Sequence, residues 1–397
     1  MAAARALVRD PEVVVVGGGI AGLGSALGLA RVGVRVRVLE RAQAFGEVGA
    51  GLQMAPNATR ILDRWGLLDE VIDQGVLPRR LVMKDALDGA ELTHLDLAEV
   101  GRRYGAPYVV IHRSDLHRIL LAECVRLGVE LVTGADVEAV DLADGEATVR
   151  SVDNPVRTAA VLAADGLDSR LRQRLSADRP VNSTYVAYRG ARPLEEFDDR
   201  DDLDLTDVVV YVGPRCHLVQ YPLRGGTMFN QVAVFQSAAA LAGADTWGTP
   251  EELDGAFADT APQVQAALRH LWRDRRWPMF DREPIGTWVD GRLALVGDAA
   301  HPMLQYLAQG ACQALEDAVA LADLVEDRAT GQAAVDWDHV LTNYAAARAG
   351  RTAEVQRTAR AWGEFWHCHG EEREQRNALL RERSVDDFSR IDWLYGR

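Results

Sequence analysis

A glycine-rich turn between two apolar segments constrains the fold of this chain more than any other stretch. Residues 13–16 are four consecutive valines that run directly into three glycines. A continuous β-branched run bounded by glycine is typical of a strand buried on both faces of a parallel sheet. Small and apolar residues follow at helical spacing, and a second apolar run, residues 34–39, ends on Glu40. This order predicts a strand, a helix and a second, parallel strand.

The glycines match the GxGxxG pattern of dinucleotide-binding turns. Gly17 would form the tight turn, Gly19 would let the backbone approach a diphosphate, and Gly22 would let the helix lie against the strand. Glu40 follows at about the 20 residues expected for an acid that binds a ribose hydroxyl. The four features together predict a bound ADP-containing dinucleotide, and the alternative is a glycine-rich turn without a ligand.

Composition and charge narrow the class of protein. The 397 residues allow two or three domains, and the net charge of −15 argues against a nucleic-acid or anionic-membrane surface. A small acidic substrate remains compatible, because a few local arginines would decide its binding. The four cysteines have no CxxC spacing, which favours free thiols in a reducing compartment. We see no secretory signal and no apolar run of membrane-spanning length, so we expect a cytoplasmic protein.

The pattern along the chain predicts an α/β fold (α+β overall) with interleaved parts. A Rossmann-like dinucleotide-binding domain would be interrupted by a substrate domain built on an antiparallel sheet, and the chain would end in helices. The predicted bounds are 1–80, 109–178 and 286–330 for the dinucleotide-binding domain, 81–108 and 179–285 for the substrate domain, and 331–397 for the helical C-terminal region.

Three local expectations follow from single residues and short patterns. Asn57 has the side chain of an N-cap for a helix that ends near Gly66. A basic helix would start at Leu171, after the Asp165-Gly166 turn. A helical insert near residues 250–272 would interrupt the antiparallel sheet.

Three signatures in a fixed order identify a family. The glycine turn with Glu40 comes first, Asp165-Gly166 comes second, and Gly297-Asp298 comes last, after a buried apolar strand. The chain resembles the single-component FAD-dependent aromatic hydroxylases, the p-hydroxybenzoate hydroxylase-like group A flavoprotein monooxygenases. The resemblance covers nearly the whole chain and implies that the dinucleotide is FAD.

The resemblance also implies which residues contact the cofactor. Arg41 would lie at the adenosine side or be solvated, and Arg113 would lie near the phosphates or serve only as a charge at a helix start. Asp298 would accept hydrogen bonds from cofactor hydroxyls, and the segment up to Gly310 would pass the flavin ring. The full set of expected cofactor-binding residues is Gly17, Gly19, Gly22, Glu40, Arg41, Gln53, Arg113, Asp165, Gly297, Asp298 and Gly310.

Within this family the chain is similar to the branch of 3-hydroxybenzoate 6-hydroxylase and salicylate hydroxylase, on segments 49–62, 111–117 and 297–318. The resemblance implies that His217 takes the phenolic proton and that Gln305 orients the phenolic oxygen. Tyr221 lies on the same face of the predicted strand as His217 and would line the ring pocket. Without the resemblance, His217 would be read as a hydrogen-bonded histidine of a half-buried strand.

The implied reaction consumes a nicotinamide cofactor and oxygen. NADH, or alternatively NADPH, would dock transiently and reduce the flavin, and a flavin hydroperoxide would attack an electron-rich ring. Hydroxylation of 3-hydroxybenzoate para to the phenol would give 2,5-dihydroxybenzoate (gentisate). The alternatives are a decarboxylating salicylate hydroxylase, another aromatic or polyketide hydroxylase, and an FAD-binding reductase without oxygenation.

Some assignments stay open at this point. The partner of the substrate carboxylate is not chosen by spacing among six candidates. The run His367-Cys368-His369 is not expected to bind a metal, because neighbouring residues of a helix cannot all face one ion. The family implies a homodimer. The six carboxylate candidates are Arg79, Arg80, Lys84, Tyr104, Tyr108 and Arg189.

Overall fold

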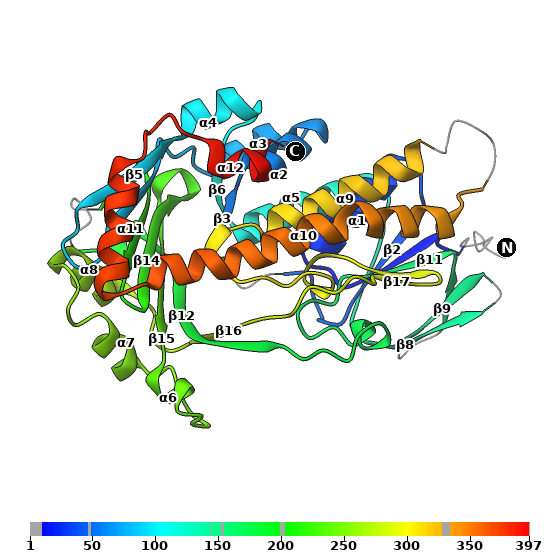
Figure 1. Cartoon of the computed structure of the whole chain (residues 1–397). Helices are drawn as coiled ribbons and strands as arrows, with labels where there is room; N and C mark the ends of the chain where they lie inside the picture. Colours follow the sequence, from blue (N-terminus) through cyan, green and yellow to red (C-terminus); the bar gives the residue numbers. More distant parts are fainter. Residues whose placement is uncertain are drawn as a thin grey trace.

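A six-stranded sheet carries the glycine-rich turn. The structure is a computed structural model that describes residues 10–46, 49–143, 145–151, 155–198, 203–327 and 334–396 (Figure 1). The strand order is β17-β18-β11-β1-β2-β7, and all neighbours except β17 and β18 are parallel. The strands are β1 (Val13–Val16), β2 (Val36–Glu40), β7 (Glu130–Thr133), β11 (Ala160–Ala163), β17 (Val289–Asp290) and β18 (Leu293–Leu295).

The centre of this sheet confirms the predicted Rossmann-like arrangement. Every residue of β1 and β11 is buried, as expected for strands covered on both faces. The three central strands come from segments far apart in the sequence, so this part of the fold is discontinuous. Helices α1 (Ile20–Arg31), α5 (Arg113–Arg126) and α9 (Gly310–Glu326) lie against the sheet, and α1 contacts both of the others.

A seven-stranded sheet forms the second large sheet of the molecule. Its order is β16-β12-β15-β14-β13-β4-β5, and it is antiparallel except for the parallel pair β4 and β13. The sheet is therefore mixed, because an early hairpin adds to its edge. The strands are β4 (Arg80–Asp85), β5 (Glu91–Asp96), β12 (Val181–Pro193), β13 (Val208–Gly213), β14 (Cys216–Leu223), β15 (Met228–Gln236) and β16 (Trp277–Asp281).

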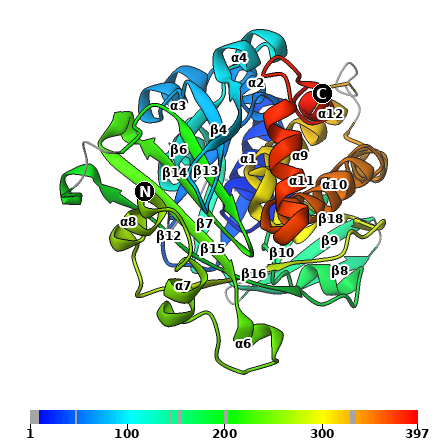
Figure 2. The same cartoon turned by 60° about the vertical axis from the view of Figure 1, so that its left-hand side comes forward.

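The two faces of this sheet have different coverings. Helices α7 (Pro250–Ala256) and α8 (Pro262–Ala267) cover one face, where Phe257 packs with Tyr188 and Phe235 (Figure 2). These helices confirm the expected helical insert. The other face turns toward the six-stranded sheet and carries His217 and Tyr221.

Shorter elements connect the two sheets. Strands β3 and β6 pair as an antiparallel two-stranded sheet, and β8, β9 and β10 form a separate three-stranded sheet. The remaining bounds are β3 (Gly51–Met54), β6 (Val109–His112), β8 (Val137–Ala143), β9 (Glu146–Ser151), β10 (Val156–Thr158), α2 (Pro56–Arg64), α3 (Leu68–Gln74), α4 (Leu97–Tyr104), α6 (Ala238–Leu241), α11 (Gly370–Glu382) and α12 (Ser389–Tyr395).

One long helix joins the two halves of the molecule. Helix α10 (Trp337–His367) runs from the six-stranded sheet to the seven-stranded sheet, where α11 follows it (Figure 1). Within the described ranges, no helix is both long enough and apolar enough to cross a membrane.

Two local expectations were wrong. Asn57 does not cap a helix: α2 begins at Pro56, its N-cap is Ala55, and the Asn57 side chain is buried. Its amide donates to Glu316 Oε1 at 2.6 Å, so a tertiary contact replaces the local cap. At Leu171 the chain forms only one 3₁₀ turn, Leu171–Arg174, whose buried Arg172 bonds the carbonyls of neighbouring segments.

We expect Gly22→Ala to destabilise the fold strongly. A Cβ at Gly22 would lie 1.9 Å from the carbonyl oxygen of Gly17, so helix α1 would have to move away from β1. Overpacking of this kind costs about 1–3 kcal/mol or more. The measurement is the free energy of unfolding in urea.

Gly101→Ala is the matched control, because Gly101 is also helical and its added Cβ would meet atoms only at 3.7 Å. Alanine should be neutral there, or stabilise by up to about 1 kcal/mol. Equal effects of the two substitutions would refute the close-packing role of Gly22.

Candidate active site

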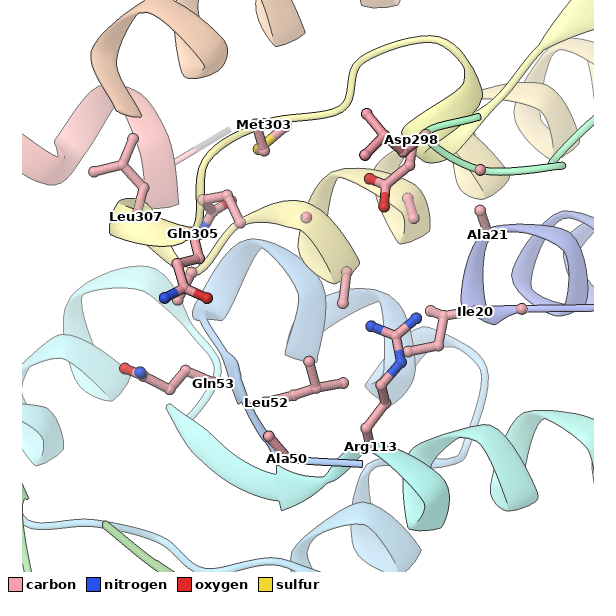
Figure 3. Close-up of a pocket in the computed structure, with 18 of the residues that line it drawn as sticks. Ile20, Ala21, Ala50, Leu52, Gln53, Arg113, Asp298, Met303, Gln305 and Leu307 are labelled. Atoms are coloured by element: carbon pink, nitrogen blue, oxygen red, sulfur yellow. The ribbon is translucent and has the colours of Figure 1, made fainter. Parts of the chain in front are cut away.

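A cavity of about 730 Å³ lies between the two sheets. This volume is in the usual range for a small-molecule or cofactor site. One end is formed by the glycine turn and α1, and the other by β14 and the segment before α9. Figure 3 shows Ile20 and Ala21 at the first end and Gln53 and Gln305 at the second.

The glycine turn forms the first end. Gly17 has φ +109°, and a Cβ there would lie 2.4 Å from the carbonyl oxygen of Ala164, so only glycine fits. Gly19 precedes the first turn of α1, whose residues are apolar and whose N-terminus faces the cavity. Free backbone N–H groups at such a terminus favour an anion such as a diphosphate.

Charged side chains surround the same end. Arg113, the first residue of α5, and Asp298 point into the cavity from opposite sides (Figure 3). Glu40 ends β2 and is held by two backbone donors, Gly18 N–H at 2.7 Å and Ala42 N–H at 2.8 Å. Arg41, beside it, is exposed and also lines the cavity. This arrangement fixes a carboxylate beside the turn, where it can accept a hydrogen bond from a ribose hydroxyl.

Gly22 and Gly297 do not line the cavity but allow close packing of the elements that do. Gly22 lets α1 touch β1, and a Cβ at Gly297 would lie 2.4 Å from the Cβ of Ala21. Gly297 has φ +58°, so a side chain there would also strain the backbone. Both glycines therefore hold α1 close to its neighbours, and their direct contact with a cofactor stays a prediction.

A second helix N-terminus opens on the cavity at Gly310. Residues 310–312, the first turn of α9, are glycine and apolar residues, so no acid within this turn offsets the positive end of the helix dipole. Ala308 before it has φ +52°, which is rare for a residue with a side chain. Gln309 is buried, and its Nε2 has no hydrogen-bond partner among the residues that the structure describes. The N-terminus of α9 and the Gln309 amide could therefore donate hydrogen bonds to an electron-rich ring edge of a bound cofactor.

Asp165 lies in the cavity wall, but its carboxylate is used by its own loop. Its oxygen atoms accept from Ser169 Oγ at 2.6 Å and from the N–H of Arg170 at 2.9 Å. The DG motif therefore shapes the turn after β11. A direct contact between Asp165 and the cofactor stays a prediction.

A buried carboxylate holds the segment between β18 and α9. Asp317 is fully buried, and its oxygen atoms accept from Gly297 N–H at 2.9 Å, His301 Nε2 at 2.6 Å and Arg348 Nε at 2.8 Å. Burial pushes the pKa of the Asp317 carboxyl upward, but His301 and Arg348 outweigh burial and lower the pKa to about 2. His301 is thus a structural residue of the network.

The far end of the cavity brings the predicted substrate residues together. His217, Val219 and Tyr221 alternate along β14 and all line it, so the predicted common face is confirmed. Gln305 lines it from the 3₁₀ turn Gln305–Leu307, and Gln53 accepts a hydrogen bond from Tyr108 at 2.8 Å.

The hydrogen-bond partner of His217 was not foreseen from the sequence. His217 Nδ1 lies 2.8 Å from Nε2 of His367, at the end of α10. The rings of Tyr306 and Trp366 meet the His217 ring edge to face, at 5.6 Å and 5.1 Å. Nothing in the local pattern His367-Cys368-His369 indicates this contact. Within the described ranges, no group of three His, Cys, Asp or Glu side chains could hold an ion.

Of the six candidates for the substrate carboxylate, two line the cavity: Arg189 on β12 and Tyr108. The other four contact surrounding residues. Arg79 bonds Thr206, Arg80 bonds Asp207, Lys84 lies over the ring of Tyr211, and Tyr104 donates to Asp392.

We expect the buried His217 to make the protein sensitive to acid. Burial lowers the pKa of His217 from about 6.5 to about 3, so the unfolded chain binds one more proton at this residue between these values. The stability due to this residue is complete above pH 6.5 and is lost as the pH falls toward 3. His217→Phe should reduce the pH slope of the unfolding free energy by up to about 1.4 kcal/mol per pH unit.

Urea unfolding between pH 4 and 7 measures this slope, with the exposed His339→Phe as the control. An unchanged slope in His217→Phe would contradict a neutral, buried His217.

Comparison with known proteins identifies the family of this chain. The family model described as "FAD binding domain" matches residues 10–359. The chain is 37% identical over 391 residues to the 3-hydroxybenzoate 6-hydroxylase of Polaromonas naphthalenivorans, covering 98% of this chain and 96% of the relative. It is 38% identical over 394 residues to the enzyme of the same name from Klebsiella oxytoca, with 98% of each chain covered.

Solved structures show the same fold, and one of them contains FAD. Klebsiella pneumoniae HpxO complexed with FAD and uric acid is 26% identical with a TM-score of 0.83, over 96% of this chain and 94% of that one. A salicylate hydroxylase substrate complex is 26% identical with a TM-score of 0.79, over 98% and 96%. The chain therefore belongs to the FAD-binding domain family and, within it, to the FAD-dependent aromatic monooxygenases.

Proposed function

We propose that this enzyme hydroxylates 3-hydroxybenzoate para to its phenol, giving 2,5-dihydroxybenzoate (gentisate). One observation carries the proposal: a chain similar over its full length to 3-hydroxybenzoate 6-hydroxylases gathers His217, Tyr221 and Gln305 in one cavity. This cavity also contains the glycine turn at its other end, so one space can hold the cofactor and the ring beside it.

The cofactor end fits FAD through residues of this chain. The N-termini of α1 and α9 would receive the diphosphate and the flavin ring edge, Glu40 would receive a ribose hydroxyl, and Arg113 and Asp298 would contact the chain between them. Bound FAD supplies the redox chemistry: it takes electrons from a nicotinamide cofactor and activates O₂.

The substrate end prepares the phenol for attack. An unperturbed phenol has a pKa near 10, so at neutral pH a base must take its proton to make the ring electron-rich. His217 lines this wall, and burial lowers the pKa of its imidazole, so the ring is neutral and has a lone pair that can accept the proton. Gln305 orients the phenolic oxygen, and Tyr221 packs beside the ring.

Arg189 is the group that receives the substrate carboxylate. It lies on β12 beside Tyr221: burial raises the pKa of Tyr221, and the Arg189 charge opposes this rise. Its guanidinium also stacks on Trp277, 5.1 Å from the ring centroid, which fixes its direction. A planar guanidinium can bind a carboxylate through two hydrogen bonds.

The remaining assignments complete the proposal. NADH, or alternatively NADPH, is the transient electron donor.

The protein is a cytoplasmic homodimer. The four free cysteines support a reducing compartment, and the family resemblance supports the dimer. Light scattering on the protein as it elutes from a sizing column measures the subunit number. The parts predicted from the sequence, 1–80, 109–178 and 286–330 for FAD and 81–108 and 179–285 for substrate, with helices at 331–397, are proposed as the functional domains.

The decisive test is product identification with a panel of hydroxybenzoates. Purified holoenzyme with NADH and O₂ should form gentisate from 3-hydroxybenzoate, with one NADH consumed per gentisate. Catechol and carbon dioxide from salicylate would move the enzyme to the salicylate hydroxylase reaction. NADH oxidation without any hydroxylated product would contradict monooxygenase activity on these acids.

We expect Arg189→Gln to weaken binding of 3-hydroxybenzoate about tenfold or more, because a charge-paired hydrogen bond is lost. The measurement is the dissociation constant from the change in flavin absorbance on titration. FAD content should stay at the wild-type level, since Arg189 lies at the substrate end.

Arg79→Gln is the matched control, because Arg79 is 70% exposed and bonds Thr206 outside the cavity. Unchanged affinity in Arg189→Gln would remove Arg189 from the substrate site.

A further inference from the structure

His217 and His367 form a buried pair of imidazoles between two distant parts of the chain. Their side chains approach at 2.8 Å, Nδ1 to Nε2, and the residues are 1% and 4% exposed. The two ring planes differ by 20° and the ring centroids are 5.0 Å apart, so the imidazoles meet edge to edge, while Tyr185 stacks on His367 at a centroid distance of 4.5 Å. The carbonyl of His367 accepts a hydrogen bond from Arg215 N–H at 3.0 Å, which fastens the end of α10 to the turn before β14.

The direction of the hydrogen bond decides what His217 can do. A neutral imidazole carries its hydrogen on one nitrogen and a lone pair on the other. To take the phenolic proton at Nε2, His217 needs its lone pair there, and its hydrogen must then sit on Nδ1. A buried Nδ1–H requires an acceptor, and among the residues that the structure describes Nε2 of His367 lies within hydrogen-bond distance. The hydrogen of His367 then sits on Nδ1.

The surroundings keep both rings neutral before substrate binds. Burial is the main cause that lowers the pKa of both, and His367 also faces the Arg376 charge. The neighbouring phenols of Tyr185 and Tyr306 stay uncharged, because burial raises their pKa. A neutral pair with one shared hydrogen bond has two possible directions, so a second feature must select one. Substrate phenol at Nε2 of His217 would select the direction described above.

We propose that His367 is a positioning residue of the hydroxylation reaction: it accepts the Nδ1–H of His217 and so keeps Nε2 of His217 available to the phenol. This inference rests on the proposed function. In the step itself, the phenolic O–H bond breaks, an Nε2–H bond forms on His217, and the electron pair stays on the oxygen. His217 becomes cationic, so its Nδ1–H bond to His367 becomes charge-assisted and stronger.

Two substitutions at one position separate hydrogen bonding from packing. Phenylalanine keeps a flat ring against Tyr185 but has no acceptor, whereas glutamine offers an amide oxygen that can replace Nε2 as the acceptor. We expect His367→Phe to lower kcat for 3-hydroxybenzoate about tenfold or more, with KM within about twofold, and His367→Gln to stay within about threefold of wild type. FAD content should be unchanged in both.

A spectroscopic measurement tests the hydrogen bond without turnover. Holoenzyme labelled with ¹⁵N in its histidine rings gives long-range ¹H–¹⁵N spectra that show which nitrogen carries the hydrogen, and the His217→Phe and His367→Phe spectra assign the two residues. With 3-hydroxybenzoate bound in the absence of NADH, His217 should carry hydrogen on Nδ1 in wild type and His367→Gln. In His367→Phe this preference should be lost.

His369→Phe is the matched control, since His369 is two residues away and exposed. It should leave kcat and the spectra of His217 unchanged. Wild-type kcat in His367→Phe, equal losses in His367→Phe and His367→Gln, or a His217 hydrogen fixed on Nε2 would each overturn the inference. A wild type that hydroxylates no 3-hydroxybenzoate would instead overturn the proposed function.

Discussion

The buried carboxylate of Asp317 is the interaction on which the site depends. It joins the end of β18, through Gly297, to helix α10, through Arg348, while it also holds His301 in the segment that leads to α9. A buried charge that lost one of these partners would be costly, because its remaining oxygen could not be solvated. The network therefore fixes the backbone that carries Asp298 into the cofactor end and Gln305 into the substrate end.

Helix α10 contacts both large sheets and so joins the two ends of the cavity between them. At its first half it packs against α9 and the six-stranded sheet, and at its end it places His367 against His217 on the seven-stranded sheet. The distance between the cofactor end and the substrate end is thus set by a rigid element with both of its ends anchored. Such anchoring suits a reaction in which small misplacements of the ring have large effects on rate.

The sequence predicted features that depend on local pattern and missed those that depend on distant contacts. The glycine turn, the buried strand before it and the common face of His217 and Tyr221 follow from spacing alone, and the structure agrees. Asn57 failed as a cap because Glu316, far along the chain, offered its amide a buried charged acceptor. His367 could not be paired with His217 from the sequence, because 150 residues separate them and nothing local marks the contact. The sequence also does not choose among the six carboxylate candidates, whereas the fold places two of them, Arg189 and Tyr108, in the cavity wall.

The interleaved strand order has a consequence for synthesis of the protein on the ribosome. Strand β1 pairs with β11 and β2, and β11 pairs with β18, so one side of β11 stays unpaired in the six-stranded sheet until residues 293–295 have emerged. The His217–His367 contact forms later still, after α10 is made. During translation the nascent chain therefore exposes an apolar strand edge for most of its elongation, which is the situation in which chaperones are needed. The His217–His367 pair is among the last contacts to form, so a chain released early would bury much of its core while the substrate end of its cavity stays incomplete.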